Sequence, residues 1–193
     1  MMRPVPRVPP FEREATYEDL EKLPDLYVAE IVGGELHASP RPAFPHARAG
    51  SRLGMVLGPP FDRGDGGPGG WFIIFEPELH LGRDVLVPDL AGWRHTRMPV
   101  FPDTAFTTLA PDWICEVLSP STERLDRDRK LRVYARERVP HAWLVDPLER
   151  RLEVLRLDDG SWCTMAVHTG TAVVRAEPFD DIELELAALW LPA

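Results

Sequence analysis

The chain has 193 residues and a formal net charge of −9 at pH 7. The length favours one domain. The negative net charge disfavours a protein that wraps nucleic acid by overall electrostatic attraction, but it is compatible with a local basic groove. No apolar run approaches the roughly 18 residues of a membrane span, and residues 1–10 lack the apolar core of a signal peptide. We therefore expect a cytoplasmic protein with no membrane segment.

The first third of the chain predicts an extended arm, a short helix, a hairpin and a longer helix. Four prolines among the first ten residues are typical of a loose arm, so we expect an arm over 1–15 and a single domain over 16–193. Gly33 and Gly34 are typical of a two-residue hairpin turn. The expected elements are a helix over 16–24, strands over 27–32 and 35–40, and a helix over 43–57 that Gly58 and Pro59 end.

The middle of the chain predicts short strands beside a flexible loop. Residues 64–70 carry too many glycines for regular structure. Pro88 and Asp89 interrupt a strand, and a proline in that place argues for an edge, a bulge or an irregularity near a site. The expected strands cover 71–75, 78–81 and 85–93, and a loop follows over 95–110.

The stretch from 111 to 147 predicts a strand, a turn, a helix and a second strand. Hydroxyl side chains in 119–122 can cap the helix, and Pro140 ends it because the residue before a proline resists helical dihedrals. Such a unit needs a sheet with a helix packed on one of its faces. The expected elements are strands over 113–118 and 142–145 and a helix over 123–138.

The C-terminal part predicts a hairpin, a short strand and a closing helix, over 151–157, 162–167, 171–174 and 182–191. Strands outnumber helices, and at least one helix crosses between strands. We therefore expect an α/β (α+β) domain with a mixed central β-sheet flanked by helices and with additional N-terminal and C-terminal hairpins. Cys115 and Cys163 lie on expected strands and are interpreted as two buried, reduced thiols.

Two acids stand in apolar strands, Asp89 and Glu116. A lone buried carboxylate is costly, and two on neighbouring strands repel each other unless a cation lies between them. Mg²⁺ (or Mn²⁺) suits this place because it prefers hard oxygen ligands and binds through a few carboxylates and substrate phosphate. Glu30 is a plausible third acid, and the backbone carbonyl of Val117 can add a ligand.

The helix after the Glu116 strand can supply a cation. Asp126, Lys130 and Tyr134 are spaced four residues apart and share one side of that helix. Lys130 is one of two lysines among 22 basic residues. Its ammonium can orient or help to deprotonate an attacking water and can offset charge in a phosphoryl transition state.

Each of these residues also has a simpler interpretation. Asp89 follows a proline and can belong to a turn, and Glu116 can pair with an arginine. Asp126 and Lys130 can form a solvated helical ion pair, and His46 can be a polar residue on a helix face.

Several longer motifs resemble the Uma2 family of proposed endonucleases over about residues 16–190. They are E-I-V-G-G-E-L at 30–36, P-D-L-A at 88–91, W-I-C-E-V-L-S-P-S-T from 113, D-x-x-x-K-x-x-x-Y from 126 and V-P-x-x-W-L-V-D-P at 139–147. The resemblance implies a restriction-endonuclease-like fold with a PD-(D/E)XK core, in which Asp89 and Glu116 match the two acids. Leu118 stands where the motif has lysine, and the sequence resembles the subset in which that lysine has moved to the following helix, to Lys130. His46 falls where the family has a histidine.

The expected function is a Mg²⁺-dependent endonuclease acting on DNA. The expected roles are metal binding by Asp89, Glu116 and Glu30, water activation by Lys130, and substrate or supporting contacts by His46, Asp126 and Tyr134. Two other functions stay open: a non-catalytic nucleic-acid-binding or assembly module that keeps the fold, and a hydrolase of a smaller phosphate ester. The resemblance, together with the many tryptophans on expected strands, also predicts a homodimer.

Overall fold

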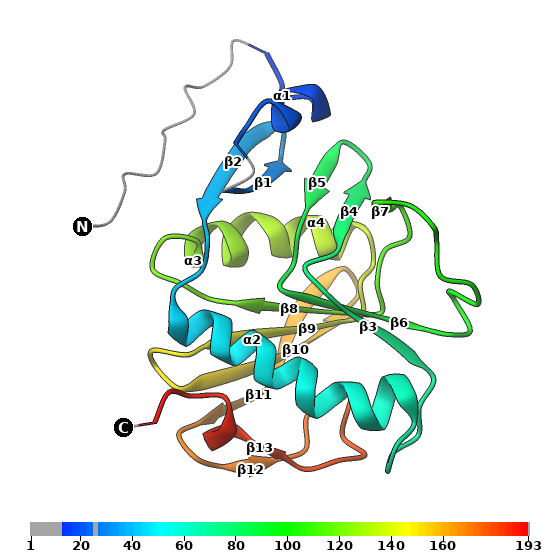
Figure 1. Ribbon diagram of the computed structural model, residues 1–193, viewed down its shortest axis with the longest axis vertical. Coiled ribbons are helices and arrows are strands. Elements are labelled where there is room, and N and C mark those ends of the chain that lie inside the picture. Colours follow the sequence, from blue (N-terminus) through cyan, green and yellow to red (C-terminus); the bar gives the residue numbers. More distant parts are fainter. Residues whose placement is uncertain (1–12, 25–26, 193) are drawn as a thin grey trace.

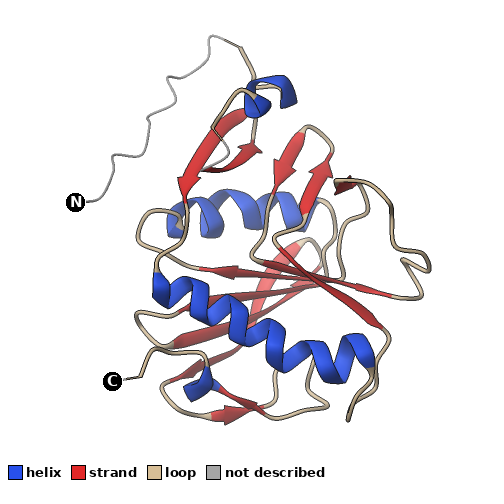
Figure 2. Ribbon diagram, viewed as in Figure 1, coloured by secondary structure: helices blue, strands red, loops and turns tan. Residues whose placement is uncertain are grey.

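A computed structural model describes residues 13–24 and 27–192 (Figure 1). Most of the predicted arm over 1–15 lies outside these residues. Strands outnumber helices, as Figure 2 shows, and the expected α+β architecture with a mixed sheet is confirmed. In the described part of the chain, no helix is both long and apolar enough to cross a membrane. The helices are α1 (Tyr17–Glu21), α2 (Phe44–Leu57), α3 (Glu123–Leu125) and α4 (Leu131–Arg136), with π-helical segments at Gly58–Arg63 and Asp126–Lys130 and a 3₁₀ turn at Leu186–Ala188.

The larger sheet has six strands in the order β11-β10-β9-β8-β6-β3. Strands β8 and β9 run parallel and the other neighbours run antiparallel. A parallel pair needs a crossover connection, and the continuous helix formed by α3, the π-helical segment and α4 supplies it. The strands are β3 (Trp71–Phe75), β6 (Leu90–Arg94), β8 (Trp113–Val117), β9 (His141–Asp146), β10 (Arg151–Asp158) and β11 (Ser161–Thr169).

The second sheet has five short strands in the order β2-β1-β5-β4-β7. Its hairpin β1–β2 turns at Gly33 and Gly34, whose φ angles of 64° and 80° explain the need for glycine there. The buried carboxylate of Asp84 accepts hydrogen bonds from the Gly33 N–H at 2.5 Å and from Arg136 Nη1 at 2.8 Å. The strands are β1 (Tyr27–Val32), β2 (Glu35–Pro40), β4 (Glu78–Leu81), β5 (Asp84–Leu86) and β7 (Phe106–Thr107).

The expected single strand over 85–93 is wrong. The segment divides at Val87–Pro88–Asp89 into β5, which belongs to the smaller sheet, and β6, which belongs to the larger one. Pro88 has no N–H that could join a strand ladder. The Val87 N–H donates to the side-chain carboxylate of Glu30 at 2.8 Å instead of to a backbone carbonyl of a neighbouring strand. The chain therefore leaves one sheet and enters the other at Asp89.

The six-stranded sheet has an apolar cluster on each face. Trp113, Cys115 and Val117 of β8 face α2 and the C-terminal segment, whereas Ile114 faces the helix that contains α4. This alternation follows from the period of two along a strand. Figure 1 shows the two helices on opposite sides of the sheet. The central strand is thus buried on both faces, and so is any side chain it carries.

Three other expectations are corrected by packing. Helix α2 does not end at Gly58 but continues as Gly58–Arg63, because Phe61 is buried against Phe179 with ring centroids 4.7 Å apart. The expected helix over 182–191 is instead the strand β13 (Leu184–Glu185) and a 3₁₀ turn. Strand β13 pairs with β12 (Val173–Val174), which keeps the side chains of Leu184 and Leu186 in the core. Cys163 is exposed on the edge strand β11, whereas Cys115 is buried as expected.

Candidate active site

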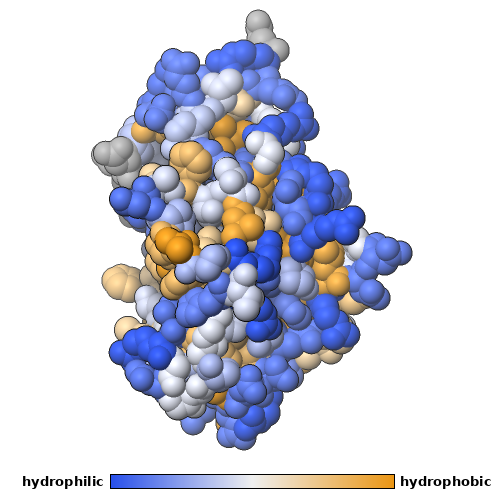
Figure 3. Space-filling view, turned by 90° about the vertical axis from the view of Figure 1, so that its right-hand side faces the viewer, coloured by the Kyte–Doolittle hydropathy of each residue, from blue (hydrophilic) through white to orange (hydrophobic). Residues whose placement is uncertain are grey.

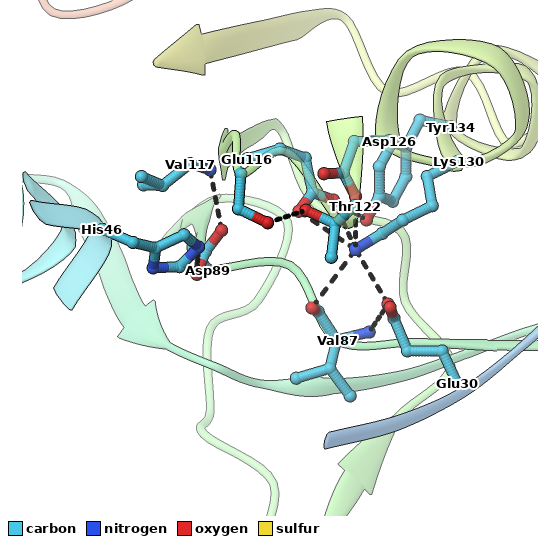
Figure 4. Close-up of polar contacts among 11 residues, drawn as sticks. Glu30, His46, Val87, Asp89, Glu116, Val117, Thr122, Asp126, Lys130 and Tyr134 are labelled. Atoms are coloured by element: carbon cyan, nitrogen blue, oxygen red, sulfur yellow. Dashed lines mark hydrogen bonds and ion pairs between the residues drawn. The ribbon is translucent and has the colours of Figure 1, made fainter. Parts of the chain in front are cut away.

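The predicted site residues come from five places in the fold and meet beside the end of β8 (Figure 4). Glu30 lies on β1, His46 on α2 and Asp89 between β5 and β6. Glu116 lies on β8, and Asp126, Lys130 and Tyr134 extend from the π-helical segment into α4. A π-helical segment inside an α-helix is frequent at functional sites.

Lys130 is the centre of the buried part of this site. Its ammonium nitrogen lies 2.8 Å from Glu30 Oε1 and 2.9 Å and 3.0 Å from the two carboxylate oxygens of Glu116. Asp126 Oδ1 is 3.6 Å away, and the carbonyl oxygen of Val87 is 3.4 Å away. The Lys130 side chain is only 2% exposed, so the interpretation as a solvated helical ion pair is wrong. The contact with Glu116 that a displaced lysine requires is present.

Glu116 has polar partners on two sides. Its Oε1 accepts a hydrogen bond from the Tyr134 hydroxyl at 2.7 Å, and its carboxylate pairs with Lys130 rather than with an arginine. Burial raises the pKa of the Glu116 carboxyl, and the nearby ammonium opposes that rise. Glu116 is therefore a desolvated acid whose charge depends on a cation beside it.

Asp89 forms a second, more accessible part of the site. Its Oδ2 accepts a hydrogen bond from the Val117 N–H at 2.7 Å, and its Oδ1 lies 3.3 Å from His46 Nε2. The side chains of Asp89 and His46 are 14% and 16% exposed. Burial raises the pKa of Asp89 to about 7 and lowers the pKa of His46 to about 4, so the imidazole is neutral at neutral pH.

The structure divides the predicted residues between these two parts. Glu30 and Asp126 lie with Lys130, while His46 lies with Asp89. Glu116 belongs to the lysine part, but its strand is directly hydrogen-bonded to Asp89 through the next residue, Val117. The two parts are thus adjacent, and Glu116 stands between them.

The chemistry of the donor set fits Mg²⁺ or Mn²⁺. Glu30, Glu116 and Asp126 surround Lys130, and Asp89 lies in the adjacent part of the site, so four buried or nearly buried acids stand near a single lysine and favour a further cation. Among the described residues, no three His, Cys, Asp or Glu side chains are already arranged as a metal cage. Lys130 stands among three of the acids, which explains why they do not form one.

The sequence did not indicate two of the polar groups at this site. The Val87 carbonyl faces Lys130 because the chain passes from one sheet to the other at this point. No local sequence pattern predicts that change of sheet. The Thr122 side chain hydrogen-bonds to Asp126 and does not cap the helix as expected. The four-residue spacing between Thr122 and Asp126 was the available signal.

Comparison with known proteins identifies the family and the fold of the chain. The model of the Uma2 family, described as "Putative restriction endonuclease", matches residues 15–188. Among solved structures, the chain is similar to one described as a "putative nuclease belonging to DUF820" from Anabaena variabilis. The two share 22% sequence identity and a TM-score of 0.68 over 91% of this chain and 97% of that chain. The likeness shows the restriction-endonuclease-like fold. No curated protein matches the chain.

Proposed function

Because the chain belongs to the Uma2 family, we propose that it is a metal-dependent endonuclease that hydrolyses phosphodiester bonds of DNA. The observation that carries the proposal is the pairing of Lys130 with Glu116 at 2.9 Å, directly beside Asp89. A nuclease needs hard oxygen ligands and a compact cation at one place, and these residue types meet here. A merely structural ion pair would not require the additional nearby acid and histidine.

Asp89 and Glu116 would hold the divalent ion, with the Val117 carbonyl as a further oxygen. The ion supplies a Lewis acid for a phosphoryl oxygen and lowers the pKa of water. Lys130 is held in place by Glu30 and Asp126, so its ammonium can donate hydrogen bonds without a conformational search. Its positive charge would stabilise the negative charge that develops on the phosphoryl oxygens.

His46 and Tyr134 have supporting roles in this proposal. The neutral imidazole of His46 is partly exposed beside Asp89 and can hydrogen-bond a phosphate oxygen or add a nitrogen ligand. Tyr134 donates to Glu116 and fixes the orientation of that carboxylate. Neither residue needs to change its charge in these roles.

The test is cleavage of supercoiled plasmid and of labelled single- and double-stranded oligonucleotides with Mg²⁺ or Mn²⁺. We expect cleavage by the wild-type chain and none by Asp89→Asn, which keeps an acceptor for the Val117 N–H but loses the charge. Calorimetric titration of both proteins with Mn²⁺ should show that binding is lost with activity.

The net charge of −9 favours a second candidate, a hydrolase of a smaller phosphate ester, because an acidic surface repels long polyanions. Turnover of bis(p-nitrophenyl) phosphate without plasmid cleavage would support that candidate. DNA binding without cleavage of either substrate, under any divalent metal, would instead favour the non-catalytic module.

A further inference from the structure

The ammonium of Lys130 is surrounded by oxygen atoms in the manner of a bound cation. Its neighbours are carboxylates of Glu30, Glu116 and Asp126 and the carbonyl of Val87, at 2.8–3.6 Å. We call these four residues the lysine cage. Their oxygens come from strands β1 and β8, from the segment between β5 and β6, and from the crossover helix (Figure 4). Carboxylate and carbonyl oxygens are also the ligands that Mg²⁺ and Mn²⁺ prefer.

The lysine cage leaves no room for a divalent ion while Lys130 is in it. Lys130 is among the largest fully buried side chains of the described residues, and its nitrogen stands within 3.0 Å of both Glu30 and Glu116. The charges within the lysine cage are also unbalanced, because three acidic side chains face one ammonium group. The cage thus has the ligands of a cation site, and the chain itself fills it.

A divalent ion from solvent meets a different set of groups first. Asp89 and His46 are 14% and 16% exposed, whereas Lys130 and Glu116 are each 2% exposed. In enzymes that use two metal ions for phosphodiester hydrolysis, the ions lie about 3.5–4 Å apart and commonly share a carboxylate. Glu116 has the position of such a shared group, since it binds Lys130 and lies one residue from the N–H that binds Asp89.

We propose that the site takes one divalent ion, beside Asp89, and that the ammonium of Lys130 is a built-in second cation standing where a two-metal enzyme holds its second ion. The inference rests on the proposed metal-dependent function. It assigns Glu30 and Asp126 to holding Lys130 rather than to binding metal. It also predicts that removing the ammonium turns the lysine cage into a second metal site.

The test counts metal ions. Calorimetric titration with Mn²⁺ should give one ion per chain for the wild type and two for Lys130→Met, in which the side chain keeps its bulk near the backbone but loses the charge. Lys22→Met is the matched control, because it removes the other lysine, which is 64% exposed and pairs with Glu18 and Asp19 rather than with the cage, and should still bind one ion. Adding Asp89→Asn to Lys130→Met should return the count to one.

Stability gives an independent measurement. Lys130→Met should unfold at a lower temperature than the wild type in EDTA, because three buried acids lose their cation. Saturating Mn²⁺ should restore more of its melting temperature than it adds to the wild type. If Lys130→Met does not fold, Lys130→Met combined with Glu30→Gln removes one of the opposing charges. Electron paramagnetic resonance of the wild type is a further test, because one isolated Mn²⁺ has a different spectrum from a coupled pair.

Each outcome has a definite meaning. Two ions or a coupled pair in the wild type would overturn the inference while leaving a metal-dependent nuclease in place. A single ion in folded Lys130→Met would also overturn it. No ion in the wild type would refute both the ion beside Asp89 and the metal-dependent function, even if Lys130→Met binds one. No ion in either protein would refute both.

Discussion

Lys130 is bound by acids from three elements, Glu30 on β1, Glu116 on β8 and Asp126 on its own helix. Burial alone lowers the pKa of a lysine, but the charges of Glu116 and Glu30 outweigh burial, and the pKa of Lys130 stays above its ordinary value. The residue is therefore a permanent cation at neutral pH. A role as general base is disfavoured, and a role as hydrogen-bond donor and electrostatic stabiliser is favoured.

Lys130→Arg should separate shape from charge. A guanidinium is larger and planar, so it cannot enter a cage that leaves Lys130 2% exposed without displacing its neighbours. We expect a loss of roughly 10²-fold or more in cleavage rate, with destabilisation of about 1–3 kcal/mol from overpacking. Single-turnover cleavage and chemical denaturation measure the two effects, and Lys22→Arg is the control. Full activity in Lys130→Arg would remove Lys130 from the mechanism.

Metal binding should depend on pH through Asp89. Burial raises the pKa of this carboxyl to about 7, and a divalent ion binds the deprotonated form, so it must displace a proton at lower pH. The pKa of His46, lowered by burial to about 4, adds no proton to displace near neutrality. Affinity for Mn²⁺ should therefore rise, by up to about tenfold per unit, between about pH 5 and pH 7.

Calorimetry in buffers of different ionisation enthalpy measures both the affinity and the number of protons released. We expect proton release on binding at about pH 6 and less at about pH 8. An affinity that is the same at both pH values would contradict the raised pKa of Asp89.

At the residue scale, the sequence predicts what lies along one element and not what crosses between elements. The four-residue spacing of Asp126, Lys130 and Tyr134 places them on one side of the helix, and all three are buried at the site. Glu30 was expected to support the metal, and the structure shows that it contacts Lys130. That contact depends on how the β1–β2 hairpin of the smaller sheet packs over the larger sheet. The alternation of side chains along a strand does not predict such packing.

Among the strands, β6 is held closely between aromatic side chains. A Cβ atom added at Gly92 would lie 3.2 Å from Trp71 and 3.3 Å from Trp113, whose side chains are buried. Gly92→Ala should therefore destabilise the protein by about 1–3 kcal/mol, because neither ring can move away freely. Chemical denaturation followed by tryptophan fluorescence measures the change.

Gly54 is the matched control for Gly92. It lies in α2, and an added Cβ would stand 3.8 Å from Leu90, an ordinary contact. Gly54→Ala should stabilise the protein by about 0.5–1 kcal/mol, because alanine restricts the unfolded chain and favours the helix. Equal effects of the two substitutions would show that the aromatic packing around Gly92 is looser than described.

At the element scale, continuous apolar patterns were sufficient for prediction and mixed patterns were not. Runs of apolar residues predict strands β3, β8 and β9, and Pro140 predicts the end of the crossover helix. The division at Pro88 and the C-terminal strand β13 do not, because each is decided by a partner distant in the sequence: Glu30 for the first and Val174 for the second. Local propensity loses to tertiary contacts in both places.

At the scale of the whole molecule, the tryptophans do not support the predicted dimer. Five of the six are buried within the chain. One exposed apolar surface lies elsewhere, at a groove of about 440 Å³ beside β3, β4 and β7. Figure 3 faces this side of the molecule and shows apolar side chains in its middle, surrounded by hydrophilic ones. Phe75, Phe101 and Phe106 line the groove and are 49%, 50% and 38% exposed.

The homodimer remains a prediction, and we propose this groove as its contact because exposed aromatic side chains are costly in a monomer. Sedimentation should show a dimer at micromolar concentration, and Phe101→Ser should shift it toward monomer. Phe44→Ser is the control, since Phe44 is 86% exposed on α2 and does not line the groove. A wild-type chain that sediments only as a monomer would exclude the dimer.

The hairpin β1–β2 has a short backbone ladder to the rest of the smaller sheet, the single pair Ile31 and Val85 with β5. Side chains add the bonds of Asp84 to Gly33, of Glu30 to Val87 and Lys130, and of Arg129 to Glu35 and His37. Local opening of such a segment costs less free energy than global unfolding. Amide hydrogens of the hairpin should therefore exchange with solvent faster than those of β8, and each opening withdraws Glu30 from Lys130. Heating would then inactivate the protein before its six-stranded sheet melts.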